Sequence, residues 1–239
     1  MKRALSVLML LVLVSPLHAA DLVTKVKGMQ IVKNLFGDQV KVLEAKDLGS
    51  LYEVVASVPG RDKQIVYVTK DGSYMLTGGS LVNKDKVNLT KERSDEVNKV
   101  DVSKLPLKDA IVIKKGSGAK QLFLITDPDC PYCKKAYEWL KTQTDYTLYV
   151  FFFPLDMHPN AAEKCVKILC DSNPEAALEL AHADQPLTAA KCESGEKMLQ
   201  KHKALATELG VSGTPLIITG NGIKMSGFNQ KALEGYLKN

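Results

Sequence analysis

The strongest constraint on the fold is a pair of cysteines, Cys130 and Cys133, at a junction between two kinds of local structure. An apolar run at 121–126 predicts a strand before them, and the pattern at 134–141 predicts a helix after them. A disulfide between cysteines this close needs a bent backbone, which the start of a helix supplies. Pro131 suits the first helical position, because its missing N–H is not needed there. The chain is therefore predicted to present a dithiol at the start of a helix.

This position predicts different chemistry for the two sulfurs. The free N–H groups and the positive end of the helix dipole favour the thiolate form of Cys130, and Lys134 and Lys135 add positive charge nearby. We expect Cys130 to be exposed and to attack disulfides. We expect Cys133, about one turn into the helix and covered by the fold, to resolve the mixed disulfide that forms.

A zinc site and a purely structural disulfide are the other uses of such a pair. A structural zinc ion needs four ligands, with a second pair at similar spacing. Cys165, Cys170 and Cys192 offer no such pair, and no two histidines have zinc-binding spacing. The strand before the pair and the helix after it favour a redox dithiol over a structural disulfide. The sequence thus predicts a redox dithiol with no metal and no other cofactor.

A second motif, Gly-Val-Ser-Gly-Thr-Pro, lies downstream at 210–215. With the dithiol, this loop resembles the cis-proline loop of the thioredoxin fold. The order of predicted elements is similar to that of the DsbC/DsbG family of periplasmic thiol:disulfide interchange proteins, and is nearer to DsbC. The resemblance implies an α+β chain: a thioredoxin-like catalytic domain with a helical insertion, preceded by a small cystatin-like dimerisation domain.

The resemblance also implies roles for single residues near the dithiol. A cis peptide bond before Pro215 would present the main chain of Thr214 to an extended substrate, so both are predicted to bind substrate. Tyr132 would add an apolar wall to this surface. Pro131 would tune the redox potential. Pro-Tyr stands between the cysteines in DsbG, whereas well-known DsbC proteins have Gly-Tyr, so the sequence leaves the oxidant strength open.

Three further cysteines lie in or beside the predicted helical insertion. If 160–170 is helical, the Cα atoms of Cys165 and Cys170 are about 8 to 9 Å apart, too far for a disulfide. Cys165 shares the apolar stripe of that helix, so we expect a buried core thiol. The resemblance implies a structural disulfide between Cys170 and Cys192, which by loop closure would stabilise the domain by about 3 kcal/mol.

The pattern of the catalytic domain, 105–239, fits the same fold. Asp127 and Asp129 are expected to form the turn before the dithiol rather than to carry protons. Further strands are predicted at 110–114, 147–153 and 215–219, and helices at 174–183, 194–209 and 230–237. The run at 147–153 is apolar without alternation, which predicts a strand covered on both faces.

Residues 1–20 have the pattern of a cleaved secretory signal peptide. Lys2 and Arg3 precede an eleven-residue apolar run, and the segment 15–20 ends in the small residues Ala19 and Ala20. The run is too short to span a bilayer, which takes about 20 residues. The mature protein is therefore expected outside the reducing cytosol, and the family resemblance implies the periplasm.

Residues 21–90 are predicted to form a separate α+β unit, the dimerisation domain. Apolar spacing predicts a helix at 21–36, and β-rich runs follow at 40–43, 51–58, 65–69 and 74–77, the last two joined by an Asp71-Gly72 hairpin. The unit contains no cysteine or histidine, which favours assembly over chemistry. Pairing of its open strand edges across a two-fold axis would give a homodimer, and a capping subdomain in a monomer is the alternative.

The segment 91–104 is polar and charged, and is expected to be an exposed, partly helical linker with Thr90 as the helix cap. Over the whole chain, 32 Lys and Arg residues stand against 27 Asp and Glu residues, a net charge of +5. The basic residues are scattered and lack interleaved aromatic residues, which argues against nucleic acid as a partner.

The resulting prediction is an enzyme, a disulfide isomerase or reductase that rearranges wrong disulfides in misfolded or mis-oxidised secreted proteins. The resemblance implies re-reduction by a DsbD-like membrane reductase. The alternatives are a DsbG-like reductase that protects single oxidised cysteines, a dimeric holdase chaperone whose dithiol is secondary, and a monomeric DsbA-like oxidase. The extra amino-terminal unit disfavours the oxidase.

Overall fold

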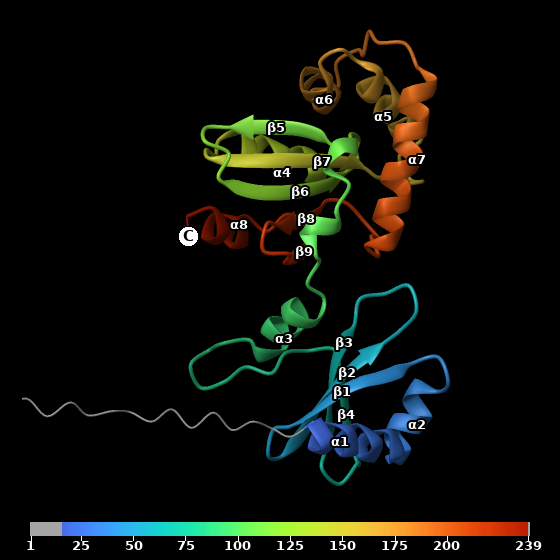
Figure 1. Cartoon of the computed structure of the whole chain (residues 1–239), viewed down its shortest axis with the longest axis vertical. Helices are drawn as coiled ribbons and strands as arrows, with labels where there is room; N and C mark the ends of the chain where they lie inside the picture. Colours follow the sequence, from blue (N-terminus) through green and yellow to red (C-terminus); the bar gives the residue numbers. More distant parts are fainter. Residues whose placement is uncertain (1–15, 239) are drawn as a thin grey trace, which may run out of the picture. The chain divides into compact units, whose positions relative to one another are not determined.

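A computed structural model describes residues 16–238, and the chain divides into two compact units between Ser94 and Asp95. Each unit has its own sheet (Figure 1). Each also has its own buried hydrophobic side chains. Most of the predicted signal peptide lies outside the described residues, and 16–20 belong to the first helix. Within the described part of the chain, no helix combines the length and apolar character needed to cross a membrane.

The first unit packs two helices on an antiparallel sheet in which neighbouring strands follow one another along the chain. Its elements are α1 (Pro16–Gly28), α2 (Gln30–Phe36), β1 (Lys41–Asp47), β2 (Leu51–Ser57), β3 (Gln64–Thr69) and β4 (Met75–Thr77), with strand order β1-β2-β3-β4. The single helix predicted at 21–36 is in fact two helices, because Met29 has an extended conformation between them. Gly72 takes the positive φ of the predicted hairpin, and Asp71 accepts a hydrogen bond from the N–H of Ser73.

Helix α3 (Leu89–Val97) follows this sheet. The side chain of Asn88 accepts a hydrogen bond from the N–H of Lys91 and so caps the helix. The prediction that Thr90 is the cap is therefore wrong. The Thr90 hydroxyl instead accepts from the N–H of Leu81 and lies 2.7 Å from the hydroxyl of Tyr67 on β3, because it faces the sheet rather than the helix start.

The segment that follows α3 differs from the exposed connector expected from its polar sequence. Val100 and Val102 pack against the hydrophobic core of the second unit. The N–H of Val100 donates to the carbonyl of Gly222, and a Cβ added at Gly222 would lie 2.3 Å from the carbonyl oxygen of Val100. This close backbone approach attaches the segment to the second unit.

The second unit is a five-stranded sheet with helices on its faces and at one end. Its elements are η1 (Val102–Lys104), η2 (Leu107–Asp109), β5 (Ile111–Lys115), β6 (Lys120–Thr126), α4 (Pro131–Lys141), β7 (Tyr146–Phe152), α5 (Ala161–Cys170), α6 (Pro174–His182), α7 (Glu193–Glu208), β8 (Leu216–Thr219), β9 (Lys224–Ser226) and α8 (Gln230–Lys238). The strand order is β5-β7-β6-β8-β9, with β6 and β7 parallel and the other pairs antiparallel. Figure 1 shows α5, α6 and α7 grouped together as the insertion between β7 and β8.

Both faces of the central strands are buried, as the apolar runs predict. Along β6, Leu122 and Leu124 join a core with α4, α5, α6 and α8, whereas Phe123 and Ile125 join a second core with the carboxyl-terminal half of α7. The side chains of β7 alternate between the same two cores. The alternation of side chains along a strand therefore gives each face its own helical cover.

A buried histidine fixes α7 to the sheet. Nδ1 of His202 accepts the N–H of Phe152 at 3.1 Å, and its Nε2 donates to the carbonyl of Asp109 at 2.6 Å. Burial lowers the pKa of His202, so the ring is neutral and can both accept and donate. This link sets the position of the insertion relative to the sheet.

The cysteines of the insertion lie where the sequence and the resemblance place them. Cys170 and Cys192 form a disulfide with Cα atoms 5.9 Å apart, which joins the end of α5 to the start of α7. Cys165 is a free, fully buried thiol whose pKa is raised well above its usual value by burial, with Asp127 and Asp129 adding to the effect.

Gly195 in the first turn of α7 gives a test of this packing. A Cβ at Gly195 would lie 2.4 Å from Sγ of Cys170 and 3.0 Å from the carbonyl oxygen of Val166. Gly195→Ala is expected to lower the free energy of unfolding by about 2 kcal/mol, because the disulfide cannot move aside. Gly235→Ala in α8 is the matched control: its Cβ would meet nothing within 4 Å, and it should raise stability by about 0.5 to 1 kcal/mol. Urea unfolding of both variants measures these changes in the free energy of unfolding. Equal changes in the two variants would contradict the close packing at Gly195.

Candidate active site

The dithiol stands at the end of the central strand β6, at the start of α4. Cys130 is the N-cap residue of α4, and Pro131 is in the first turn, as predicted. The N–H of Lys134 donates to the carbonyl of Cys130, which closes the first turn of the helix. Cys133 lies one turn into α4, on its buried side.

The loop before β8 lies over the dithiol. The peptide bond between Thr214 and Pro215 is cis. Because β6 and β8 pair antiparallel, with Ile125 opposite Leu216, the segment that leaves β6 and the segment that enters β8 meet at the same end of the sheet. Sγ of Cys130 lies 3.4 Å from the carbonyl oxygen of Thr214. The structure thus brings together two motifs that are 84 residues apart in the sequence.

The two sulfurs have different surroundings, and one differs from expectation. Cys133 is fully buried, and burial raises its pKa to about 12. Cys130, which the sequence predicts to be exposed, is only 4 % exposed because the loop at Thr214 covers it. Tyr132 between them is 66 % exposed and forms part of the outer surface of the site.

Charged side chains next to the dithiol are paired with residues of the insertion. Nζ of Lys134 lies 2.8 Å from a carboxylate oxygen of Asp184, which directly follows the cap of α6. This pairing offsets the positive charge that the sequence places next to the cysteines. Asp129, directly before Cys130, forms an ion pair with Lys164 of α5.

The carboxyl group of Asp127 is fully buried and is held from several sides. One oxygen accepts from the N–H of Asp129, which is the turn-forming role that the sequence predicts. The other oxygen accepts from the N–H of Leu155 and lies 2.8 Å from Nδ1 of His158. His158 was not expected at the site: its spacing of 31 residues from Asp127 follows no motif, and the contact depends on how the chain returns after β7.

A second residue without a sequence signal is Thr126, the last residue of β6. Its hydroxyl and that of Thr214 act on Cys133 and lower its pKa, against the larger effect of burial. The N–H of Asp127 also donates to Sγ of Cys133, at 3.5 Å. In an apolar strand a terminal threonine looks like an ordinary β-branched residue, so its sequence position alone does not predict this effect on Cys133.

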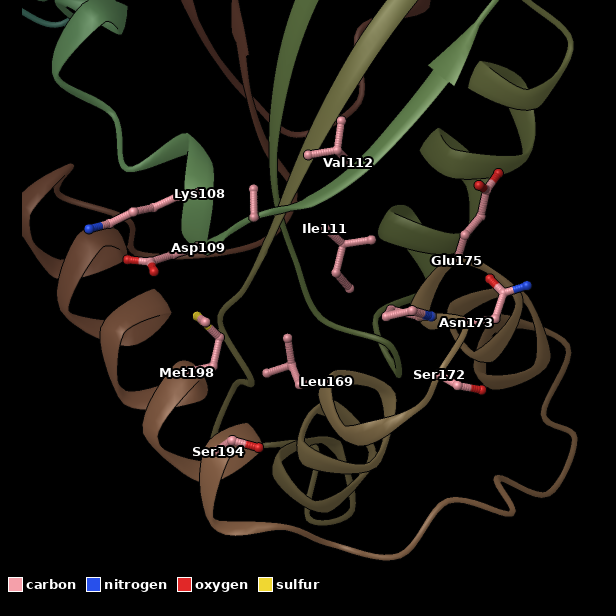
Figure 2. A pocket seen from close by; sticks show the side chains of 12 residues that line it. Lys108, Asp109, Ile111, Val112, Leu169, Ser172, Asn173, Glu175, Ser194 and Met198 are labelled. Atoms are coloured by element: carbon pink, nitrogen blue, oxygen red, sulfur yellow. The ribbon is translucent and has the colours of Figure 1, made fainter.

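A hollow elsewhere in the second unit has no unpaired acidic side chain among the described residues that line it. An open hollow of about 430 Å³ lies between the start of β5 and the insertion, and Figure 2 shows Ile111, Leu169 and Met198 around it. Its acidic side chains, Asp109 and Glu175, are already paired with lysines. Among residues 16–238 no group of three or more metal-ligating side chains comes together. The dithiol, with the cis-proline loop 3.4 Å from Sγ of Cys130, is the candidate active site.

Comparison with known proteins gives the same family. The thioredoxin-like domain family matches residues 107–239. The chain is 29% identical over 162 residues to a probable thiol:disulfide interchange protein DsbC of Bordetella avium, an alignment that covers 67% of this chain and 57% of the relative. It is 30% identical over 181 residues to the thiol:disulfide interchange protein DsbC of Salmonella typhimurium, with 72% of each protein covered.

Among solved structures, a disulfide interchange protein from Neisseria gonorrhoeae is similar, with a TM-score of 0.51 and 28% identity. That similarity covers 56% of this chain and 96% of the gonococcal one. The chain aligns with less than two thirds of the length of the Bordetella relative. The family resemblance read from the sequence is confirmed: the chain belongs to the thioredoxin-like family and, within it, to the DsbC thiol:disulfide interchange proteins.

Proposed function

We propose that this protein is a periplasmic enzyme that reduces and isomerises incorrect disulfides in secreted proteins by thiol–disulfide exchange. The observation that carries this proposal is the position of Cys130, at the start of α4 and 3.4 Å from the Thr214 carbonyl of a cis-proline loop. A buried second thiol, Cys133, lies one turn away on the same helix. Such a pair suits attack by one sulfur and resolution by the other.

In the proposed reaction, the thiolate of Cys130 attacks one sulfur of a wrong disulfide. A bond forms between Cys130 and that sulfur, and the other substrate sulfur leaves as a thiolate that takes a proton from water. Isomerisation is complete when another thiol of the substrate displaces Cys130 and closes the correct disulfide. Alternatively Cys133 displaces the substrate, which leaves reduced while the enzyme becomes oxidised. A DsbD-like membrane reductase would then restore the dithiol.

Substrate contact is proposed at the rim of the dithiol. The main chain of Thr214 and Pro215 would pair with an extended substrate segment, as a short added strand. Tyr132, with most of its side chain exposed, would provide an apolar surface beside it. Pro131 would set the redox potential by its effect on the first turn of α4.

Assembly as a homodimer is proposed through the first unit. Its outer strands, β1 and β4, each pair with a single neighbour within the described sheet. Exposed apolar side chains occur on both strands, Leu43 on β1 and Leu76 on β4. Pairing of such edges between two copies would satisfy the backbone groups and cover these side chains.

Isomerase activity is the first test. The reduced full-length protein is expected to reactivate a scrambled multi-disulfide enzyme, and Cys130→Ala should lose nearly all of this activity because the attacking sulfur is gone. Cys165→Ala, which removes a buried thiol outside the dithiol, is the control and should retain it. If the wild type fails to reactivate while Cys130→Ala suppresses aggregation, the holdase alternative replaces the proposal. Repair of single oxidised cysteines without reactivation would favour the DsbG-like reductase.

The division of labour in the dithiol is the second test. Cys133→Ser removes resolution and leaves attack intact, so it should accumulate mixed disulfides with secreted proteins, visible on non-reducing gels. Cys130→Ser should accumulate none. In the reduced wild type, alkylation followed by peptide mapping should label Cys130 far faster than the fully buried Cys133. Labelling of Cys133 first would reverse the assignment.

Assembly is the third test. The mature protein should sediment as a dimer at micromolar concentration. A fragment of residues 95–239, which keeps the Val100 and Val102 packing, should be a folded monomer that still reduces disulfides. A monomeric full-length protein would contradict the proposed dimer.

A further inference from the structure

Two buried hydroxyl groups beside the dithiol have no hydrogen-bond partner. They belong to Thr126 at the end of β6 and to Thr214 before the cis peptide bond. Thr126 is fully buried, and both Oγ1 atoms are shielded from solvent. Buried polar groups in folded proteins are nearly always paired, because an unpaired hydroxyl has lost its hydrogen bonds to water. Their place in the fold therefore requires an explanation.

Both hydroxyls favour the charged form of the same group, the thiol of Cys133. Each lowers the pKa of that thiol, and the N–H of Asp127 acts in the same direction. This N–H lies 3.5 Å from Sγ of Cys133. Thr126 directly precedes Asp127 at the end of β6, and Thr214 lies in the loop that covers the dithiol before β8, so the donors come from two segments on either side of the dithiol.

The other groups of the site are already engaged. The carboxyl oxygens of Asp127 accept from two N–H groups and lie against His158. The sulfur of Cys130 is directed at the carbonyl oxygen of Thr214 rather than at its hydroxyl. Cys133 remains, and as a neutral thiol it is a weak acceptor that leaves the hydroxyls unsatisfied. As a thiolate it would be a strong, charged acceptor.

We propose that the hydroxyls of Thr126 and Thr214, together with the N–H of Asp127, form a preorganised site for the thiolate of Cys133 and so accelerate the resolving step. This inference rests on the proposed thiol–disulfide exchange. Donors fixed in a dry site stabilise charge that develops during reaction without having to reorganise. The two hydroxyls are unpaired in the neutral enzyme because their partner exists only during resolution.

The resolving step is balanced without another reagent. The thiolate of Cys133 gives an electron pair to the sulfur of Cys130, and the bond between these two sulfurs forms. The bond between Cys130 and the substrate sulfur breaks, and the substrate sulfur leaves with the bonding pair as a thiolate. The proton that Cys133 gives up to solvent is matched by the proton that the departing thiolate takes up. The substrate sulfur is reduced and the enzyme dithiol is oxidised.

Stopped-flow reaction of the reduced, full-length protein with dithiobis(nitrobenzoate) distinguishes the attack by Cys130 from the displacement by Cys133. Attack by Cys130 releases one coloured thiolate, and displacement by Cys133 releases the second, so the second phase reports resolution with no need for outside access to the buried sulfur. Thr126→Val keeps the shape of the side chain and removes the hydroxyl. It should slow the second phase about tenfold, the effect of losing one hydrogen bond to a charged group, and leave the first phase within about twofold.

Thr126→Ser is the matched control, because it restores a hydroxyl in a smaller side chain. It should recover most of the rate of the second phase. Thr214→Val should also slow that phase, because it removes the second hydroxyl. The main-chain carbonyl near Cys130 remains in this variant. The thermal midpoint of Thr126→Val should be unchanged or raised, because an unpaired buried hydroxyl is removed.

The possible failures are distinguishable. If the wild type releases no coloured thiolate and exchanges no disulfides, the proposed function fails. If both phases occur in the wild type and Thr126→Val leaves the second unchanged, the thiolate site is wrong and the exchange function stands. If Thr126→Ser is as slow as Thr126→Val, the residue acts through packing, and the inference is likewise overturned.

Discussion

The antiparallel pairing of β6 with β8 is the constraint on which the rest of the site depends. It places the dithiol and the cis-proline loop at the same end of the sheet, although the whole helical insertion separates them in the sequence. The 3.4 Å approach between Cys130 and Thr214 and the burial of Cys133 both follow from this register. A slip by one residue would turn the apolar side chains of β6 to the opposite faces and separate the two loops.

The two cysteines differ in their positions on the same helix. Cys130 is the N-cap residue of α4, and its sulfur lies 3.4 Å from the carbonyl oxygen of Thr214. Cys133, one turn further, is in the core, where burial raises its pKa to about 12 while neighbouring donors oppose the rise. An attacking sulfur must be charged before it meets substrate, whereas a resolving sulfur must be charged only afterwards. The two positions suit this order, because Cys130 stands at the helix start beside the exposed Tyr132, whereas Cys133 lies one turn further into the helix, on its buried side.

The insertion is part of the site as well as of the core. It supplies Asp184 to Lys134 of the active-site helix and Lys164 to the residue before Cys130. These partly exposed ion pairs each contribute little to stability, about 0 to 1 kcal/mol, so their main effect is on the local charge around the dithiol. The disulfide between α5 and α7 and the buried His202 hold the insertion in the position that makes these contacts.

The sequence by itself determined the features that local chemistry encodes: the dithiol at a helix start, the proline in its first turn, and the strands covered on both faces. The family resemblance read from the sequence also marked Thr214 and Pro215 as the opposing loop. Only the tertiary structure decided the burial of Cys130, the Asp127–His158 contact and the unpaired hydroxyl of Thr126. The physical reason is that these contacts join segments far apart in the chain. Their geometry depends on strand register and on the packing of the insertion, which no local spacing of residue types records.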